Sequence, residues 1–343
     1  MNNSKRDILV IRLSALGDVA MTIPAIYSVA ITYPQYSFRI ITSSPCDQLF
    51  INRPINISIR SLAPKDLHGV IGTLRLLLHI RKMPVDAVAD LHNVPRSWVV
   101  DAFCLLRGKT IAMLDKKRWE RRSILRNHHT TKTPYTDRYF NVFARLGLIC
   151  EPHFSNLFAN VIPVLPKLLF KQSNAIWIGI APFARYANKT YPIDQMRLVV
   201  SQLAQSVSRE VFLFGSGSTE SQLLKEWCEG SPNIHCIAGL LSLNKELELM
   251  SYLDVMVTMD SANMHLASLA GIRVVSIWGG TSPACGFLGW KQNTDDAMLS
   301  NISCQPCTIA GKNYCRYGHY HCLTSITPED IINKVDEIVS KKM

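Results

Sequence analysis

Short apolar runs rich in Val and Ile alternate along the chain with longer amphipathic stretches. This alternation is typical of strand–helix–strand units that build parallel sheets. In the first half it predicts strands at residues 8–13, 38–42, 87–91 and 110–113, with helices that include 22–31 and 69–81. In the second half it predicts strands at 176–180, 211–214, 235–237, 255–258 and 274–278, and helices at 193–205, 219–228, 244–253 and 263–270. The fold class is therefore α/β, with two doubly wound parallel sheets.

The two occurrences of this pattern divide the chain into two domains. A length of 343 residues leads to the same number, because a domain takes about 150 residues. Residues 156–171 contain Pro163 and Pro166 and are predicted to cross between the domains, which we place at 1–165 and 172–325. Residues 326–343 form a terminal helix that begins at Thr327, where Pro328 and two acidic residues follow.

Positive charge is concentrated in the first half of the chain. Residues 1–150 carry 22 Lys and Arg against 10 Asp and Glu, whereas residues 151–343 carry 15 against 16. The densest run consists of Lys116, Lys117, Arg118, Arg121 and Arg122, followed by Arg126. Such a run indicates a surface for a polyanion, either nucleic acid, anionic lipid or a phosphorylated substrate, or else a solvated basic face. No helix-turn-helix, zinc-finger or RNA-binding signature accompanies it, so we expect no nucleic-acid partner.

Export and membrane insertion are not expected. Arg12 and Asp18 interrupt the apolar N-terminus, which we interpret as a strand rather than a signal peptide, and no apolar run reaches the roughly 18 residues of a spanning helix. The ten cysteines are then expected to be reduced thiols. Four of them have a C-x2-C-x7-C-x6-C spacing, namely Cys304, Cys307, Cys315 and Cys322. This spacing suits either a zinc site or a metal-free loop, and it matches no common zinc module.

The turn after the first predicted strand carries the first candidate for chemistry. In doubly wound folds ligands bind outside the carboxyl ends of the strands. Gly17 allows a tight turn there, and Asp18 either removes a proton from a substrate hydroxyl or caps the following helix. The turn lacks the glycines of G-x-G-x-x-G, which argues against a nicotinamide dehydrogenase.

The loops after strands in the second half favour a nucleotide diphosphate. Asp260 and Ser261 precede a predicted helix whose free N–H groups suit a phosphate, and Asp260 would face sugar hydroxyls because it repels phosphate. His265 either contacts the ligand or is hydrogen-bonded within the helix packing; the residues alone favour packing. Small-residue turns at 215–220 and 279–283, together with Lys189, complete a positive, glycine-lined pocket, although each turn alone is an ordinary surface turn. No G-x-S-x-G elbow or P-loop is present.

Collinear motifs resemble glycosyltransferase family 9, the ADP-heptose:lipopolysaccharide heptosyltransferases. They are residues 11–19 (IRLSALGDV) with Pro24-Ala25, residues 90–92 (DLH), 189–192 (KTYP), 260–267 (DSANMHLA) and 280–283 (GTSP). The resemblance covers nearly the whole chain, including the cysteine-rich tail and the terminal helix. It implies a GT-B fold of two Rossmann-like domains, an N-terminal one for the acceptor and a C-terminal one for the sugar nucleotide, with the terminal helix packing back on the N-terminal domain.

The resemblance also implies roles for individual residues. Asp18 matches the catalytic base of an inverting transfer from ADP-heptose, and Lys189 matches the lysine that neutralises the departing diphosphate. Ser261, Ala262, Asn263 and Met264 would contact the phosphates, Asp260 the heptose and Glu220 the ribose. Leu241 lies where the adenine pocket is expected, and His265 belongs to the same donor segment. No cofactor is implied.

The acceptor implied by this resemblance is the anionic inner core of lipopolysaccharide, which matches the basic first half. We therefore expect Gly17 and the basic run from Lys116 to Arg122 to contact the acceptor, and a cytoplasmic enzyme peripheral to the inner membrane. Ala262 stands where the family usually has Gly, and Arg185 and Tyr186 replace small hydroxyl residues before the lysine. Two alternatives stay open: a related transferase with another nucleotide sugar or glycan acceptor, and a non-catalytic nucleotide-binding protein.

Overall fold

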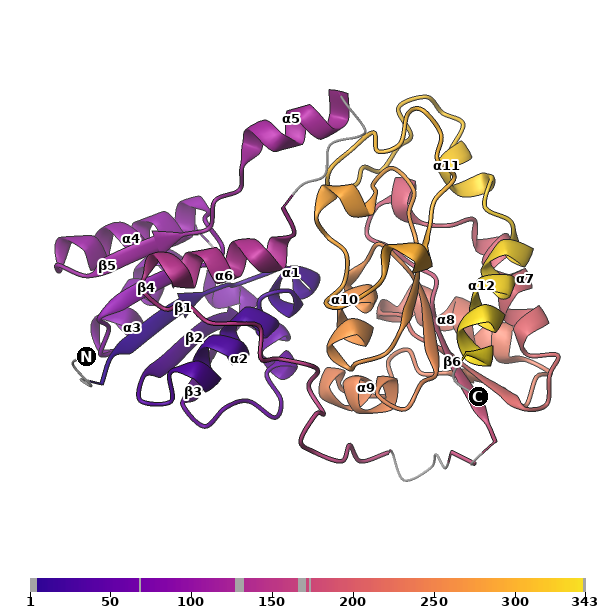
Figure 1. The fold of residues 1–343 in the computed structure, drawn as a ribbon, viewed down its shortest axis with the longest axis horizontal. Coiled ribbons are helices and arrows are strands. Elements are labelled where there is room, and N and C mark those ends of the chain that lie inside the picture. The colour runs from indigo at the N-terminus through magenta and orange to yellow at the C-terminus, as the bar shows by residue number, and fades with distance from the viewer. Residues whose placement is uncertain (1–4, 68, 127–132, 166–170, 173, 342–343) are drawn as a thin grey trace. The chain divides into compact units, whose positions relative to one another are not determined.

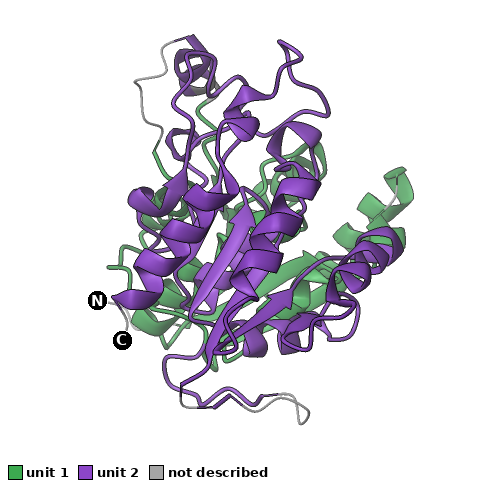
Figure 2. Cartoon of the chain, turned by 90° about the vertical axis from the view of Figure 1, so that its right-hand side faces the viewer, with its two compact units in different colours: residues 1–117, 133–157 green, residues 118–132, 158–343 purple. Residues whose placement is uncertain are grey.

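The computed structural model describes residues 5–67, 69–126, 133–165, 171–172 and 174–341 (Figure 1). It divides into two compact units, unit 1 with residues 1–117 and 133–157, and unit 2 with residues 118–132 and 158–343 (Figure 2). Each unit is built around its own parallel sheet, as the alternation of strands and helices predicts.

Unit 1 contains, within its described residues, a sheet of five parallel strands in the order β3-β2-β1-β4-β5. Its strands are β1 (Asp7–Ile11), β2 (Ser37–Ser43), β3 (Ile57–Leu62), β4 (Ala87–Asp90) and β5 (Thr110–Met113). Its helices are α1 (Leu16–Ala20), α2 (Ile23–Thr32), α3 (Gly69–Arg81), α4 (Pro95–Leu106) and α6 (Tyr135–Arg145), with 3-10 turns at Cys46–Leu49 and Pro64–Leu67. The chain runs outward from β1 to β3 and then returns to β4, so the winding direction changes between β1 and β4.

The core of unit 1 lies between this sheet and the helices on its two faces. α3 and α4 share a core cluster with β1 and β4, to which Leu9, Leu76 and Val100 belong. α2 and α6 pack against each other, and Phe143 of α6 meets Phe38 of β2 edge to face. Residues of β1 from Ile8 onward are buried on both faces of the sheet, which explains the continuous apolar run in the sequence.

Unit 2 contains six parallel strands within the part of the chain that the structure describes, in the order β11-β10-β9-β6-β7-β8. These strands are β6 (Ile176–Ala181), β7 (Arg209–Leu213), β8 (Ile234–Cys236), β9 (Val255–Met259), β10 (Val274–Ile277) and β11 (Ala297–Met298). The helices are α5 (Arg118–Arg126), α7 (Ile193–Leu203), α8 (Gly217–Cys228), α9 (Leu243–Met250), α10 (Ala262–Leu269), α11 (His321–Thr324) and α12 (Pro328–Ser340). Short 3-10 turns lie at Ala187–Lys189, Pro283–Cys285 and Thr294–Asp296. Here the winding direction changes between β6 and β9.

The strand predictions are confirmed for all nine predicted strands, while β3 and β11 are additional. β3 is an edge strand in which exposed residues interrupt the buried ones, so it lacks the continuous apolar run that marks the inner strands. β11 has only two residues. The predicted start of the terminal helix is confirmed by a capping box, in which Thr327 Oγ1 accepts the Asp330 N–H at 3.1 Å and Asp330 Oδ2 accepts the Thr327 N–H at 2.8 Å.

Two domain expectations are corrected. The terminal helix α12 was expected on the N-terminal domain, but Ile331, Val335 and Ile338 are buried in the core of unit 2, where α12 packs on α7 and β9. Helix α5 lies inside the predicted first domain but belongs to unit 2, because its Ile124 is buried against Cys285 and Ile309. In both helices the apolar face packs on residues distant in sequence.

Candidate active site

In unit 1, Asp18 lies beyond the carboxyl end of β1, at the point where the winding direction of the sheet changes. β1 ends at Ile11, and α1 begins at Leu16, which places Asp18 in the first turn of this helix. The side chain of Asp18 is 36% exposed, and its Oδ2 lies 2.7 Å from Nη2 of Arg12. Arg12 is buried and donates from Nη1 to the Leu91 carbonyl at 2.7 Å, so it connects the ends of β1 and β4.

The helix-cap alternative for Asp18 does not fit this geometry. The N-cap of α1 is Ala15, and α1 has no side-chain cap hydrogen bond. Asp18 is instead an ion-paired carboxylate that Arg12 orients while part of it faces solvent. A carboxylate in this state can accept a proton from a hydroxyl that comes within hydrogen-bond reach.

His92 adjoins this pair from the end of β4. Burial, followed by the nearby charges of Arg12 and Lys116, lowers the pKa of His92 to about 3. Its Nδ1 accepts the Leu13 N–H at 3.4 Å, which leaves the proton of the neutral ring on Nε2. His92 is thus a neutral donor near Asp18 at physiological pH rather than an additional cation.

The predicted basic acceptor cluster is divided by the structure. Lys116 lies at the unit 1 site, where its Nζ donates to the Asn93 carbonyl at 2.7 Å. Lys117 has a left-handed backbone conformation, and its Nζ contacts Thr133 Oγ1 at 3.4 Å. The backbone of Arg118, Arg121 and Arg122 belongs to α5 of unit 2. Of this cluster, only Lys116 and Lys117 therefore lie in unit 1 with Gly17 and Asp18.

In unit 2, the predicted donor residues Lys189 and Asp260 are in direct contact. Lys189 follows β6 and Asp260 follows β9, the two strands between which the winding direction changes. Lys189 Nζ lies 2.8 Å from Asp260 Oδ2, and the two side chains are 13% and 4% exposed. Thr281 Oγ1 donates to the same oxygen at 2.7 Å. This position is where doubly wound sheets bind their ligands.

The N-terminus of α10 begins directly beside this ion pair. Ser261 is the N-cap, and no side chain caps the free N–H groups of the first turn, which Ala262, Asn263 and Met264 provide. The Met264 side chain is fully buried, so its backbone N–H is the group available to a ligand. Uncapped N–H groups at a helix N-terminus attract anions, and the ammonium group of Lys189 lies beside them, paired with Asp260. His265 is buried within α10.

The glycine turn after β10 packs against the loop that carries Lys189. Asn188, beside the lysine, is buried, and its carbonyl accepts the Gly280 N–H at 2.7 Å. A Cβ at Gly279 would lie 2.3 Å from that carbonyl oxygen, so only glycine permits this approach. The Ser282 hydroxyl is buried and has no hydrogen-bond partner among the described residues.

Glu220 and Leu241, the residues expected at the ribose and at the adenine pocket, lie beyond the ends of two strands of unit 2. Glu220 lies in the first turn of α8, and its Oε2 accepts the Ser216 N–H at 2.7 Å. Leu241 is partly exposed in the loop between β8 and α9. Glu220 therefore follows β7 and Leu241 follows β8, which are neighbouring strands of the sheet.

Three residues of the two sites were not assigned roles from the sequence. Arg12 orients Asp18, Thr281 binds Asp260, and Asn188 supports the glycine turn. A signal existed for Arg12, since an arginine directly after a buried apolar strand requires a buried partner. Thr281 and Asn188 are ordinary loop residues in sequence, and their partners lie on other loops.

The structure gives no support to the zinc alternative at the cysteine cluster. All ten cysteines are free thiols, and no three His, Cys, Asp or Glu side chains in the described part of the chain are arranged to hold a metal ion. Cys322 is packed into the core of unit 2, and Cys307 packs beside Gly280. These two thiols contribute to loop packing.

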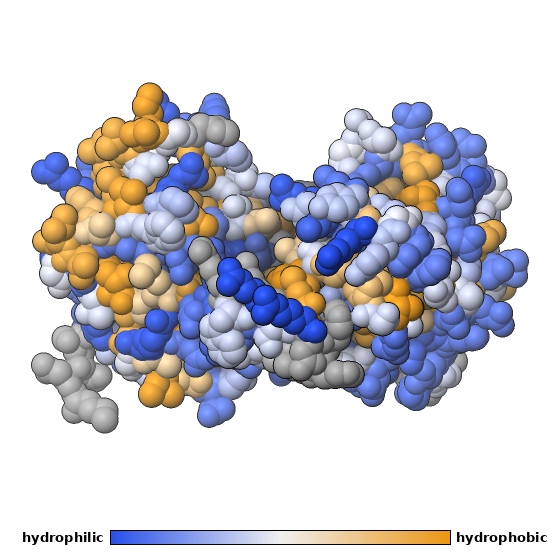
Figure 3. All heavy atoms as spheres, turned by 90° about the horizontal axis from the view of Figure 1, so that it is seen from above, coloured by the Kyte–Doolittle hydropathy of each residue, from blue (hydrophilic) through white to orange (hydrophobic). Residues whose placement is uncertain are grey.

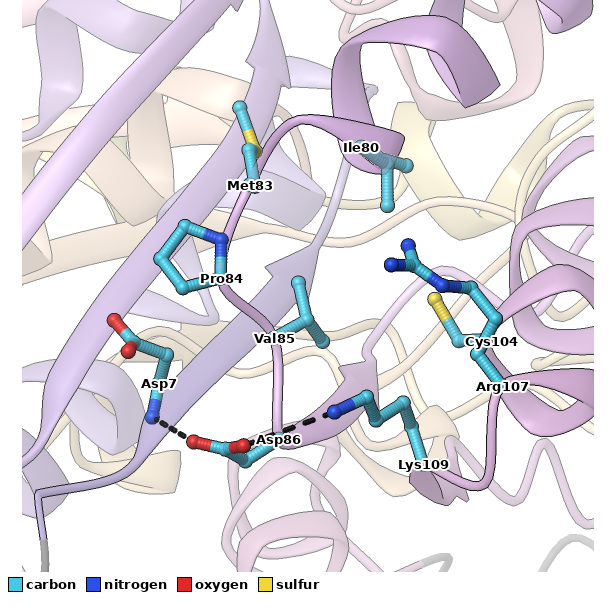
Figure 4. Close-up of a pocket in the computed structure, with 9 residues that line it drawn as sticks. All are labelled: Asp7, Ile80, Met83, Pro84, Val85, Asp86, Cys104, Arg107 and Lys109. Atoms are coloured by element: carbon cyan, nitrogen blue, oxygen red, sulfur yellow. Dashed lines mark hydrogen bonds and ion pairs between the residues drawn. The ribbon is translucent and has the colours of Figure 1, made fainter.

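A separate pocket of about 260 Å³ lies at the opposite end of the unit 1 strands (Figure 4). It adjoins the amino ends of β1, β4 and β5 and is lined in part by Asp7, Asp86 and Lys109. Asp86 accepts the Asp7 N–H at 2.9 Å and lies 3.8 Å from Lys109 Nζ, so these polar groups of the pocket interact with one another. This pocket is not at the edge of the sheet that carries Asp18.

Two Rossmann-like units, each with its candidate site at the switch point of a parallel sheet, define the GT-B class of glycosyltransferases. The model of glycosyltransferase family 9 (heptosyltransferase) matches residues 73–321, and the chain belongs to this family. It is 20% identical over 336 residues to lipooligosaccharide heptosyltransferase 2 of Campylobacter jejuni, with 94% of this chain and 95% of that protein covered.

Solved structures show the same fold. A family 9 glycosyl transferase from Veillonella parvula superposes with a TM-score of 0.74 at 18% identity, covering 98% of both chains. The Escherichia coli heptosyltransferase WaaC with ADP gives a TM-score of 0.68 at 16% identity, covering 97% of this chain and 99% of that one. The chain is accordingly a glycosyltransferase. None of its described helices has the length and apolar character needed to span a bilayer.

Proposed function

We propose that this enzyme transfers heptose from ADP-heptose to a hydroxyl of the lipopolysaccharide inner core, with inversion at the anomeric carbon. The observation that carries the proposal is the Arg12–Asp18 pair beyond β1, which presents a partly exposed, oriented carboxylate in the basic unit. The Campylobacter relative is called a lipooligosaccharide heptosyltransferase, and the solved E. coli relative carries ADP, which supports this donor and acceptor class.

The proposed reaction assigns a step to each site. The acceptor hydroxyl gives its proton to Asp18, and its oxygen attacks the anomeric carbon from the face opposite the diphosphate. The bond from that carbon to the diphosphate oxygen breaks, and ADP leaves with the bonding electron pair. Lys189 and the N–H groups that begin α10 stabilise the charge of the leaving diphosphate, and Asp260 binds hydroxyls of the sugar.

Asp18→Asn is the direct test. The amide retains the shape and the hydrogen bond to Arg12 but cannot accept the proton, so turnover should fall by about 10²–10⁴-fold with ADP affinity unchanged. Asp66→Asn is the matched control, because Asp66 is an exposed carboxylate of unit 1 that also pairs with an arginine, Arg75, at 3.4 Å. Turnover of Asp18→Asn within a few-fold of the wild type would remove the general-base role.

The donor is tested separately by titration calorimetry with ADP-heptose, ADP, UDP-glucose and GDP-mannose. Selective binding of the two adenine nucleotides is expected. Ala262 stands at the first position of α10, where its methyl group narrows the approach of a phosphate. The narrower approach is the reason to test one alternative, in which the same fold uses a different nucleotide sugar. Preference for UDP-glucose or GDP-mannose would establish that alternative, and binding of ADP-heptose without transfer would favour a non-catalytic protein.

The acceptor and the location belong to the same proposal. The first half of the chain carries the whole basic excess, which suits an acceptor bearing carboxylates and phosphates at the cytoplasmic face of the inner membrane. Transfer should therefore be slower with an acceptor whose anionic groups have been removed.

A further inference from the structure

Helices α3 and α4 of unit 1 each carry two apolar faces. Their inner faces, to which Leu76 and Ile80 of α3 and Val100 and Cys104 of α4 belong, pack in the core beneath the sheet. A surface helix with one buried face normally has a polar opposite face. In both helices the opposite face is apolar as well.

The outward side chains form what we call the outer apolar face. In α3 it contains residues that are 54–76% exposed, and in α4 residues that are 43–89% exposed. Its members are Val70, Ile71, Leu74 and Leu78 of α3, and Trp98, Val99, Leu105 and Leu106 of α4. They recur at helical spacing, and the two helices contact each other along the same side of the sheet. Hydrophobic side chains gather on the unit 1 part of the surface in Figure 3, at the left.

Basic side chains lie on α3 and at the C-terminal ends of α3 and α4, next to this face. Residues 60–109 contain eight Lys and Arg against four Asp and Glu, and two of those acids, Asp90 and Asp101, are buried. Exposed cations lie on α3 and at the ends of both helices, at Arg75, Arg81, Lys82 and Arg107. Apolar side chains exposed among cations are typical of surfaces that bind anionic lipid head groups and bury their apolar groups at the acyl boundary.

We propose that the outer apolar face docks unit 1 on the surface of an anionic lipid bilayer. A second copy of the chain fits this surface less well, because a two-fold interface would bring the same cations together and repel. A tryptophan at the face, Trp98, also suits the boundary between head groups and acyl chains. The proposal concerns a surface, and it holds whichever sugar is transferred.

The test is flotation of the full chain with phosphatidylcholine vesicles that contain 30% phosphatidylglycerol, measured without donor or acceptor. Replacing Leu74, Leu78, Leu105 and Leu106 together by Gln should lower the partition coefficient at least tenfold. The matched control replaces Leu198 and Val207 of unit 2, which are 48% and 97% exposed, by Gln and should bind like the wild type. Equal binding of the four-fold variant and the wild type, or no binding of the wild type, would overturn the proposal.

Additional measurements make the result specific. The triple variant Arg81→Gln/Lys82→Gln/Arg107→Gln should lose binding to the anionic vesicles, and wild-type binding should weaken with salt and with pure phosphatidylcholine vesicles. Sedimentation velocity tests the rival occupant: a wild-type dimer that the four-fold variant converts to a monomer, without vesicle binding, would assign the face to a second copy. Unchanged circular dichroism and ADP binding of the variants show that they are folded, and they separate this proposal from the proposed catalytic function.

Discussion

Removing the charge of Lys189 should destabilise unit 2 through the aspartate that it leaves behind. Lys189 Nζ and Asp260 Oδ2 are 2.8 Å apart, and the carboxylate is almost fully buried. In Lys189→Met the carboxylate keeps one neutral donor, Thr281 Oγ1, at 2.7 Å. Breaking one side of a buried pair costs about 3–5 kcal/mol, and the remaining hydrogen bond favours a loss of about 3 kcal/mol.

The double variant Lys189→Met/Asp260→Asn separates this charge effect from lost packing. The neutral amide needs no cation and can still accept the hydrogen bond from Thr281, so the double variant should regain most of the lost stability. ADP affinity should fall in both variants, because the lysine is proposed to bind the diphosphate.

Denaturation followed by tryptophan fluorescence reports mainly on unit 2, which contains five of the six tryptophans. Lys341→Met is the matched control, since Lys341 lies 2.6 Å from Glu337 in an exposed pair of the same unit and should change stability by less than about 1 kcal/mol. The single variant Asp260→Asn completes the comparison. If the double variant loses as much stability as Lys189→Met and Asp260→Asn lose together, the two side chains are not coupled and the reasoning is refuted.

Three further predictions concern buried groups. Burial, followed by the charge of Asp90, raises the pKa of Asp101 to about 8, so between about pH 4 and about pH 8 the folded state holds a proton that the unfolded state has lost. The free energy of unfolding of the wild type should therefore fall by up to about 1.4 kcal/mol per pH unit from about pH 4 to about pH 8. Calorimetry of Asp101→Asn should show that this slope is removed. His92 should give a pH dependence of opposite sign, because its folded pKa of about 3 lies below the unfolded value. The free energy of unfolding should rise with pH from about 3 to about 6.5, and this rise should be absent in His92→Gln. A His92→Gln variant with the same pH profile as the wild type would contradict this prediction. Gly279→Ala places a Cβ 2.3 Å from the Asn188 carbonyl oxygen and should cost about 1–3 kcal/mol in urea denaturation; a neutral outcome would mean that the turn shifts freely.

Much of the architecture was predictable because parallel strands buried on both faces leave a continuous apolar run in the sequence. That signal identified nine strands in their order, and with them the loops that carry Asp18, Lys189 and Asp260. The same signal is absent from β3, an edge strand with exposed residues. The terminal helix was also predictable, since its capping box depends on residues three apart.

The tertiary structure alone decided which of these residues meet. The contact of Lys189 with Asp260 depends on β6 and β9 lying side by side although β7 and β8 intervene in the chain. Sequence periodicity records which face of a helix is apolar but not what covers it. For that reason only the structure could assign α5 and α12 to unit 2 and show that the second apolar face of α3 and α4 has no cover among the described residues.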